Sequence, residues 1–190
     1  MVKKAYVFLA DGFEDVEALI PVDVLRRGGV EVVTVSVMDE NLLVTSAHGV
    51  QIVADAEAAE VQFSDADLLF LPGGMPGAKN LYDSDIVRQA VKEQVQAGKL
   101  VAAICAAPAV VLGQMGLLAG RKATCYPGFE QLLQGAEYTG DLCTQDGNII
   151  TAEGPAAAFP FAYRLLALLT NEPTAQQIAD GMRFTHLMQS

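Results

Sequence analysis

Cys105 lies where a predicted strand meets a predicted helix. Leu100–Ile104 is a short apolar run typical of a buried strand, and small residues and Pro108 follow the cysteine at once. Proline suits the first turn of a helix, so the segment predicts a sharp strand-to-helix turn of the nucleophile-elbow kind. A helix N-terminus lowers the pKa of a nearby thiol and favours the reactive thiolate. The alternative is an inert buried cysteine at the end of a strand.

A glycine-rich turn follows another buried strand, predicted over residues 67–71. It reads Pro72-Gly73-Gly74, and such glycines let backbone N–H groups approach a ligand closely. The amides of Gly74 and Ala106 could together form an oxyanion hole if their two strands are neighbours. Taken alone, the segment fits an ordinary proline–glycine turn better.

Three acidic residues open the first predicted helix, which covers residues 14–27. Glu14, Asp15 and Glu17 lie in its first turn, where the helix dipole favours negative charge whatever the function. A carboxyl close to a reactive thiol could stay protonated and hydrogen-bond the thiolate. The spacing does not choose among the three.

The composition limits the chemistry. Of 190 residues, 52% are apolar, which suits one domain over residues 1–190. With 12 basic and 23 acidic residues the net charge is −11, which argues against nucleic acid and anionic membrane as main partners. The two histidines cannot build a histidine-rich metal site, and the three cysteines lack CxxC spacing, so no metal or cofactor is expected. No signal peptide or membrane span is recognisable, and a cytoplasmic protein is expected.

The flanking segments alternate between strand-like and helix-like patterns. Strands are predicted over residues 4–9, 30–38, 67–71, 100–104, 123–126, 138–142 and 148–151, with a hairpin over 42–52. Helices are predicted over residues 14–27, 83–97, 109–115, 156–169 and 174–188. This alternation predicts an α/β fold with a mostly parallel sheet and helices on both faces.

Together these segments resemble the ThiJ/PfpI superfamily, most closely its parkinsonism-associated deglycase branch. The resemblance covers essentially the whole chain. It is carried by residues 12–28, Leu71-Pro-Gly-Gly74, Ala102-Ala-Ile-Cys105-Ala-Ala-Pro108 and Glu153-Gly-Pro155. It implies a flavodoxin-like sandwich and a homodimer that packs partly through the first helix.

The resemblance also implies roles for individual residues. Cys105 corresponds to the reactive cysteine, and Glu17 to the glutamate that hydrogen-bonds its sulfur. Gly74 and Ala106 correspond to backbone donors beside that sulfur, with Gly73 next to them in the pocket.

Three positions near this pocket depart from the pattern or stay open. Tyr126 stands where some relatives have a histidine, and a tyrosine is a poor base near neutral pH. His48 stands where close relatives have an arginine that lines the pocket. It could bind an anion or be an ordinary surface histidine. Cys125 could form a disulfide with an oxidised Cys105, but a packed strand residue is the favoured interpretation.

Two functions from different classes compete. The first is enzymatic: Cys105 attacks a small α-oxoaldehyde and Glu17 moves protons, as the glyoxalase III-like or deglycase activity of the family implies. The second is oxidative-stress sensing or chaperone behaviour, with an oxidant acting on Cys105. A cysteine peptidase is less favoured because no histidine follows Cys105 in the next segment. Many members of the superfamily also carry an inherited label as thiazole monophosphate biosynthesis proteins.

Overall fold

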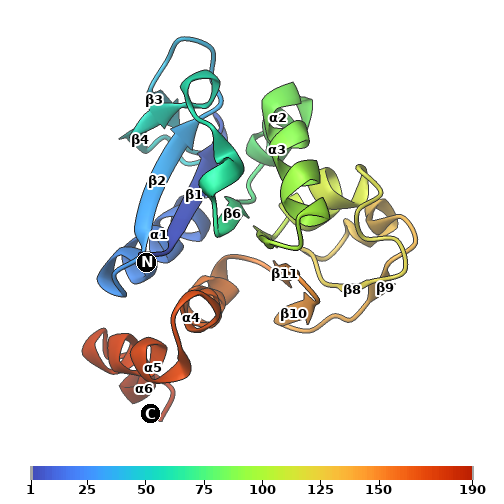
Figure 1. Ribbon diagram of the computed structural model, residues 1–190. Coiled ribbons are helices and arrows are strands. Elements are labelled where there is room, and N and C mark those ends of the chain that lie inside the picture. The colour runs from blue at the N-terminus through green and yellow to red at the C-terminus, as the bar shows by residue number, and fades with distance from the viewer. Residues whose placement is uncertain (1, 190) are drawn as a thin grey trace.

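The computed structural model describes residues 2–189 and shows a seven-stranded sheet in the order β10-β11-β7-β6-β1-β2-β5 (Figure 1). All neighbouring pairs are parallel except β10 with β11. Its strands are β1 (Lys4–Leu9), β2 (Glu31–Ser36), β5 (Ala56–Glu57), β6 (Leu68–Leu71), β7 (Leu100–Ile104), β10 (Cys143–Asp146) and β11 (Ile149–Ala152). Two small sheets accompany it: β3 (Leu43–Thr45) with β4 (Gln51–Val53), and β8 (Lys122–Ala123) with β9 (Glu137–Tyr138).

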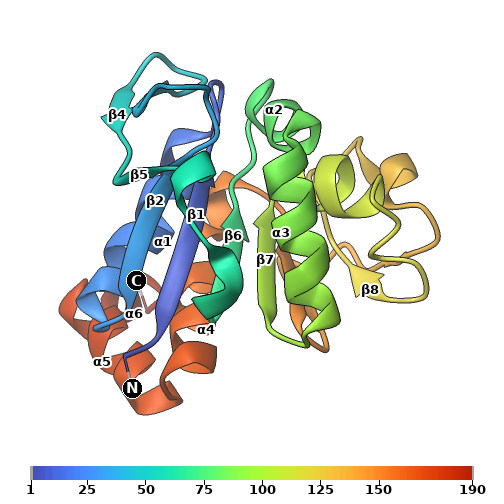
Figure 2. The same cartoon turned by 45° about the horizontal axis from the view of Figure 1, so that its top comes forward.

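Helices cover both faces of the large sheet. In Figure 2, α3 lies in front of the sheet, and α1 and α4 lie behind it. The helices are α1 (Asp15–Arg27), α2 (Gly77–Asp83), α3 (Asp85–Gln96), α4 (Ala158–Leu169), α5 (Glu172–Gly181) and α6 (Phe184–Leu187). Short helical turns are η1 (Ala58–Glu60), η2 (Phe63–Asp65), η3 (Pro108–Gly113), η4 (Glu130–Leu133) and η5 (Pro155–Ala157). The predicted α/β class and flavodoxin-like arrangement are confirmed.

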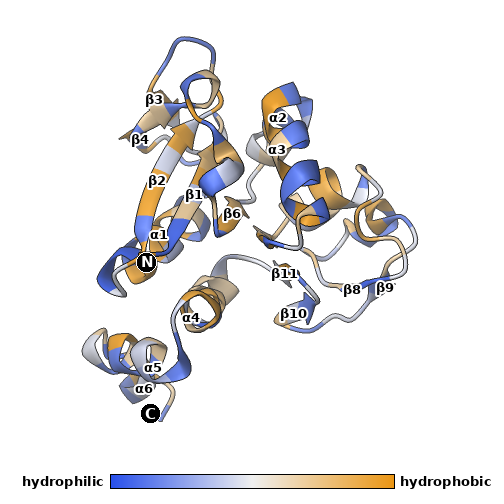
Figure 3. Ribbon diagram, viewed as in Figure 1, coloured by the Kyte–Doolittle hydropathy of each residue, from blue (hydrophilic) through white to orange (hydrophobic). Residues whose placement is uncertain are grey.

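The central strands are apolar along their length because both faces are covered. Every residue of β6 is buried, as are all residues of β7 after Leu100. Figure 3 shows β6 in the colour of apolar residues. Such continuous apolar runs are expected of parallel strands between two helical layers. Within residues 2–189, every helix is too short or too polar to cross a lipid bilayer.

The register of the central strands gathers three loops at one edge. β6 lies between β1 and β7, with Val7 beside Phe70 and Phe70 beside Ala102. All three strands run in the same direction, so the segments after Leu9, Leu71 and Ile104 leave the sheet together. Open α/β sheets bind their ligands at this carboxyl edge.

Some predicted elements were wrong in detail. The helix expected over residues 174–188 is two helices, because Arg183 adopts a left-handed φ of 66° between α5 and α6. The strand expected over residues 138–142 is only the two-residue β9, and the sequence analysis missed β10 and β5. The helix expected over residues 83–97 is α3 alone, and its start is capped by the Ser84 side chain.

Candidate active site

Cys105 occupies a sharp turn between β7 and η3. Its φ is +64°, a left-handed conformation that side chains other than glycine rarely adopt. The turn is tied down on both sides: the Cys105 amide donates to the Ala152 carbonyl (2.9 Å), and its own carbonyl accepts from Tyr126 (2.8 Å). The side chain is 8% exposed, and Ala106 and Ala107 behind it are buried. This strained turn presents the thiol at the carboxyl edge of the sheet, as the elbow prediction described.

The turn after β6 lies directly against this thiol. A Cβ added to Gly73 would lie 2.5 Å from the Cys105 Cβ and 2.5 Å from Glu17 Oε2, so only glycine fits there. Gly74 has a φ of +87°, and its amide hydrogen-bonds the Cys105 thiol together with that of Ala106. The two strands are neighbours, which was the condition for these amides to act together.

Glu17 is the acidic residue that turns inward. It lies in the first turn of α1, and its side chain is fully buried. Oε2 accepts the Gly73 amide at 3.0 Å, and the carboxyl also hydrogen-bonds the Cys105 thiol. Oε1 has no nitrogen or oxygen partner within residues 2–189. Oε1 is therefore the oxygen available to carry a proton.

The carboxyl and the thiol both resist ionisation. Burial raises the pKa of Glu17 to about 7, with a further contribution from the negative charge of Glu14. Burial also raises the pKa of the Cys105 thiol to about 12, and the charge of Glu17 adds to this. The Gly74 and Ala106 amides act in the opposite direction but do not outweigh burial. The helix N-terminus was expected to lower this thiol pKa; its Ala106 amide does so, but the net shift of the pKa is upward. A thiolate forms here most easily when Glu17 holds the proton, because two adjacent buried anions are avoided.

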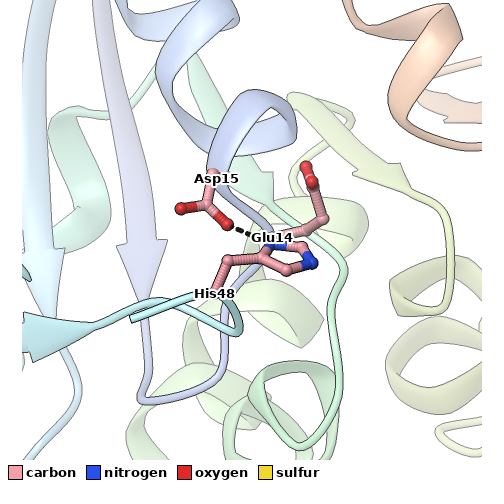
Figure 4. Close-up of side chains that lie close together, drawn as sticks. All are labelled: Glu14, Asp15 and His48. Atoms are coloured by element: carbon pink, nitrogen blue, oxygen red, sulfur yellow. Dashed lines mark hydrogen bonds and ion pairs between the residues drawn. The ribbon is translucent and has the colours of Figure 1, made fainter. Parts of the chain in front are cut away.

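The other two acidic residues of the first turn have different partners. Glu14 caps α1 by accepting the Glu17 amide at 2.8 Å. Asp15 turns toward the β3–β4 hairpin, where it accepts the Ser46 hydroxyl at 2.6 Å and meets His48 Nδ1 at 2.6 Å (Figure 4). Side-chain atoms of Glu14, Asp15 and His48 that could bind a metal lie within 4.8 Å of one another. The positive end of the helix dipole and the engagement of both Asp15 oxygens oppose a cation at this position.

Cys125 and Tyr126 come after the elbow helix in the sequence, and the backbone of Tyr126 contacts Cys105. The Tyr126 amide donates to the Cys105 carbonyl, while Tyr126 is 45% exposed and its ring packs over Gly154. Cys125 is fully buried, and burial raises the pKa of its thiol to about 12. Such a thiol is a weak nucleophile, in keeping with a packed residue.

The remaining cysteine and histidine lie elsewhere. Cys143 is on β10, the edge strand of the large sheet, and His186 is exposed on α6. The structure thus brings together Cys105, Glu17, Gly73, Gly74 and Ala106, with Tyr126 beside them. His48 lies beside Glu14 and Asp15 at the start of α1. The sequence does not predict Ser46 as part of this arrangement, and it gives Asp15 no role of its own. A serine two positions before the predicted turn histidine was the available signal.

This arrangement can perform nucleophilic chemistry at a carbonyl. The thiol is the nucleophile, and the carboxyl with a pKa near 7 can take and return a proton close to neutral pH. The two amides beside the sulfur can stabilise an oxyanion that forms on the attacked carbon. The same contacts can hold the oxygens of an oxidised sulfur.

Comparison with known proteins identifies the family. The DJ-1/PfpI family matches residues 3–168. Protein dj-1beta of Drosophila melanogaster is 38% identical over 184 residues, covering 96% of this chain and 97% of that protein. Protein DJ-1 homolog B of Arabidopsis thaliana is 39% identical over 95% of this chain, but the chain spans only 41% of that protein's length. The glutathione-independent glyoxalase DJR-1.2 of Caenorhabditis elegans is 32% identical, with 88% of this chain and 89% of that protein covered.

Solved structures show the same architecture. A cysteine-to-alanine mutant of a DJ-1 superfamily protein from Salmonella typhimurium matches with a TM-score of 0.91 and 36% identity, covering 95% of this chain and 98% of that one. DJ-1 of Toxoplasma gondii, in a structure described as oxidized, matches with a TM-score of 0.91, 38% identity and the same coverage.

Proposed function

Since the chain belongs to the DJ-1/PfpI family, we propose that it converts small α-oxoaldehydes to hydroxy acids through Cys105, with Glu17 as the acid and base. The observation that carries this proposal is the contact between a strained, shielded thiol and a buried carboxyl whose pKa is about 7. The glyoxalase named among the relatives supports the choice of substrate class. The reaction needs no metal or cofactor.

The proposed reaction begins with a proton transfer. Glu17 takes the thiol proton as sulfur bonds to the aldehyde carbon, and it then protonates the resulting oxyanion, which the Gly74 and Ala106 amides stabilise. Glu17 next moves a proton from this carbon to the neighbouring keto carbon, and the hydroxyl proton passes to the former keto oxygen. Together these two transfers convert the hemithioacetal into a thioester with a neighbouring hydroxyl group. Water hydrolyses the thioester, releasing the hydroxy acid and restoring the thiol of Cys105.

Methylglyoxal turnover tests this proposal. The wild type should produce lactate without glutathione, while Cys105→Ala and Glu17→Gln should each lose activity by at least about 10²-fold, a typical effect for removing an acid–base group. Cys143→Ala is the matched control, because it removes a cysteine on the edge strand β10 and should keep the wild-type rate. Equal rates for all four proteins would refute the proposal. Activity on glycated protein amines, measured with the same variants, separates a deglycase from a glyoxalase.

A second candidate is oxidative sensing at the same residue. Peroxide would convert the Cys105 thiol to sulfenate and a second equivalent to sulfinate, each step reducing one peroxide to water. A protonated Glu17 can donate to a sulfinate oxygen, and its Oε1 has no other nitrogen or oxygen partner within residues 2–189. The relative from Toxoplasma gondii described as oxidized favours this candidate. Mass spectrometry after mild peroxide should place two oxygens on Cys105. Earlier oxidation of Cys125 or Cys143 would contradict it.

We further propose a homodimer that packs through α1, where Val16 is 41% and Leu19 is 40% exposed. These apolar side chains on the outer face of a helix are the kind of surface that a second subunit covers. We also propose that the protein resides in the cytoplasm, because its three cysteines are free and thiols are kept reduced in that compartment.

A further inference from the structure

His48 is held in a fixed position although its side chain is 70% exposed. Asp15 binds its Nδ1 at 2.6 Å, and Asp15 is itself 16% exposed and fixed by the Ser46 hydroxyl at 2.6 Å. These contacts fix the orientation of the imidazole ring through Nδ1, and they do not use the other ring nitrogen, Nε2. Figure 4 shows this nitrogen on the side of the ring away from Asp15.

Backbone hydrogen bonds lock the hairpin turn onto the start of α1. The Ala47 amide donates to the Phe13 carbonyl at 2.7 Å, and the Gly12 amide donates to the Thr45 carbonyl at 2.8 Å. The Asp11 carboxylate accepts the Thr45 amide at 2.8 Å. His48 is thus attached to the rigid part of the fold, unlike a histidine on a loose surface loop.

The same segment of chain forms one wall of the Cys105 site. The Glu14 amide donates to the Gly73 carbonyl at 3.0 Å, and the Gly73 amide binds the Glu17 carboxyl. Glu14 lies close to both residues: its carboxylate accepts the Glu17 amide at 2.8 Å and lies within 4.8 Å of a ring nitrogen of His48. Its charge raises the pKa of Glu17 and that of His48. The Glu14 carboxylate therefore lies beside the exposed imidazole and beside the backbone of the residue that carries the buried carboxyl.

The charges around His48 argue against an anion site. Glu14 and Asp15 each contribute a negative charge, and a protonated His48 contributes one positive charge, so the cluster remains negative. The turn that follows β6 and packs against this region, residues 72–77, has no charged residue. Asp11, the remaining carboxylate nearby, is bound to the hairpin backbone. A negative surrounding favours a protonated imidazole instead.

We propose that His48, oriented by Asp15, is the second proton carrier of the Cys105 site. This inference rests on the proposed function. While Glu17 takes the proton from the carbon bonded to sulfur, the imidazolium Nε2–H donates to the oxygen of the neighbouring keto carbon, which gives an enediol. Glu17 then protonates that keto carbon, and His48 takes back a proton from the oxygen on the carbon bonded to sulfur. Both groups end in their starting states, and the thioester is ready for hydrolysis.

The expected pH dependence has a definite sign. The hydrogen bond and the negative charge of Asp15 raise the pKa of His48 above 6.5, and the charge of Glu14 adds to this. Loss of the imidazolium proton should therefore produce the alkaline limb of kcat, above pH 6.5. Glu17 must be ionised to take up a proton, so its pKa of about 7 should produce the acid limb of kcat.

Steady-state kinetics with methylglyoxal across pH 5.5–9, on the full chain, tests the inference. His48→Gln should lower kcat by about 10²-fold and remove the alkaline limb. Asp15→Asn keeps the histidine but should shift the alkaline limb to lower pH. His186→Gln is the matched control, because it removes the only other histidine and should behave as the wild type. NMR titration of the two histidine rings, assigned with this control, should show the His48 pKa falling in Asp15→Asn.

Each outcome decides the inference. Wild-type kcat and an unchanged profile in His48→Gln would overturn it while leaving the Cys105–Glu17 chemistry in place. An unmoved alkaline limb in Asp15→Asn would also overturn it. If His48→Gln slowed alkylation of Cys105 by iodoacetamide as much as it slowed turnover, His48 would support the shape of the site and not carry protons. A wild type that does not turn over methylglyoxal would overturn the proposed function and this inference together.

Discussion

Replacing Glu17 with glutamine should change how the stability of the protein depends on pH. In the folded protein, burial raises the pKa of Glu17 from the ordinary value of 4.5 to about 7. The folded state therefore binds this proton more tightly than the unfolded state. The stabilisation is complete below pH 4.5 and is lost as the pH rises through 7. Glutamine does not titrate, but its amide can still accept from Gly73 and donate toward the sulfur.

The magnitude follows from the two pKa values. A pKa change of one unit corresponds to 1.36 kcal/mol, so moving the Glu17 pKa to about 7 removes about 3 kcal/mol of stability at high pH. Between pH 5 and pH 8, the free energy of unfolding of the wild type should fall by about 2.5 kcal/mol relative to Glu17→Gln. Other titrating groups are shared by the two proteins and cancel in this difference.

Urea unfolding at fixed protein concentration measures the difference at each pH. The series starts at pH 5 because the pI of about 4.4 favours aggregation below it, and it ends at pH 8 because thiols ionise in the unfolded chain above that. Glu60→Gln is the control: it removes an exposed carboxyl on η1, and its stability should run parallel to the wild type. A wild-type curve parallel to that of Glu17→Gln within about 0.5 kcal/mol would refute a buried, proton-binding carboxyl.

Three further predictions concern the elbow and the outer face of α1. Gly73→Ala should abolish Cys105-dependent turnover and cost about 1–3 kcal/mol of stability, since the new methyl group would overlap Cys105 and Glu17; a wild-type rate would contradict the close approach. Cys105→Gly should be more stable than Cys105→Ala by about 1 kcal/mol in urea unfolding, because φ is +64° at this position, and the reverse order would mean that the turn is unstrained. Sedimentation should show a wild-type dimer and a Leu19→Asp monomer, whereas a wild type that is monomeric at all concentrations would exclude the proposed interface.

The sequence predicted the elements that are set by apolar pattern. The strand over residues 4–9 matches β1 at both ends, and the strand over residues 100–104 matches β7, because continuous apolar runs are hard to satisfy except between two helical layers. It failed at the two-residue strands β5 and β9, whose pairing depends on neighbours and not on their own residues. It also missed the break at Arg183, since a left-handed arginine has no local signal.

The candidate site, like the fold, was predictable from the sequence only in part. The positions of Cys105 and the glycine turn followed from the ends of two neighbouring strands. The roles of Glu14, Asp15 and Glu17 could not be separated, because all three fit the first turn of a helix equally well. The fold separates them: one caps the helix, one holds a histidine from a distant hairpin, and one is buried. The hairpin contact depends on tertiary packing, which no local spacing encodes.

The orientation of α1 links the buried carboxyl to the proposed dimer. On this helix Glu17 faces the core together with most of the apolar residues, while Val16 and Leu19 face outward. Rotating α1 to bury Val16 and Leu19 would expose Glu17 and other residues of the buried face, and it would remove the proton-binding pair with Cys105. In the proposed dimer, a second subunit would cover Val16 and Leu19 and so remove their apolar surface from water without any rotation of α1. Dimerisation and the raised pKa of Glu17 should therefore be coupled, and Leu19→Asp should disturb methylglyoxal turnover as well as assembly.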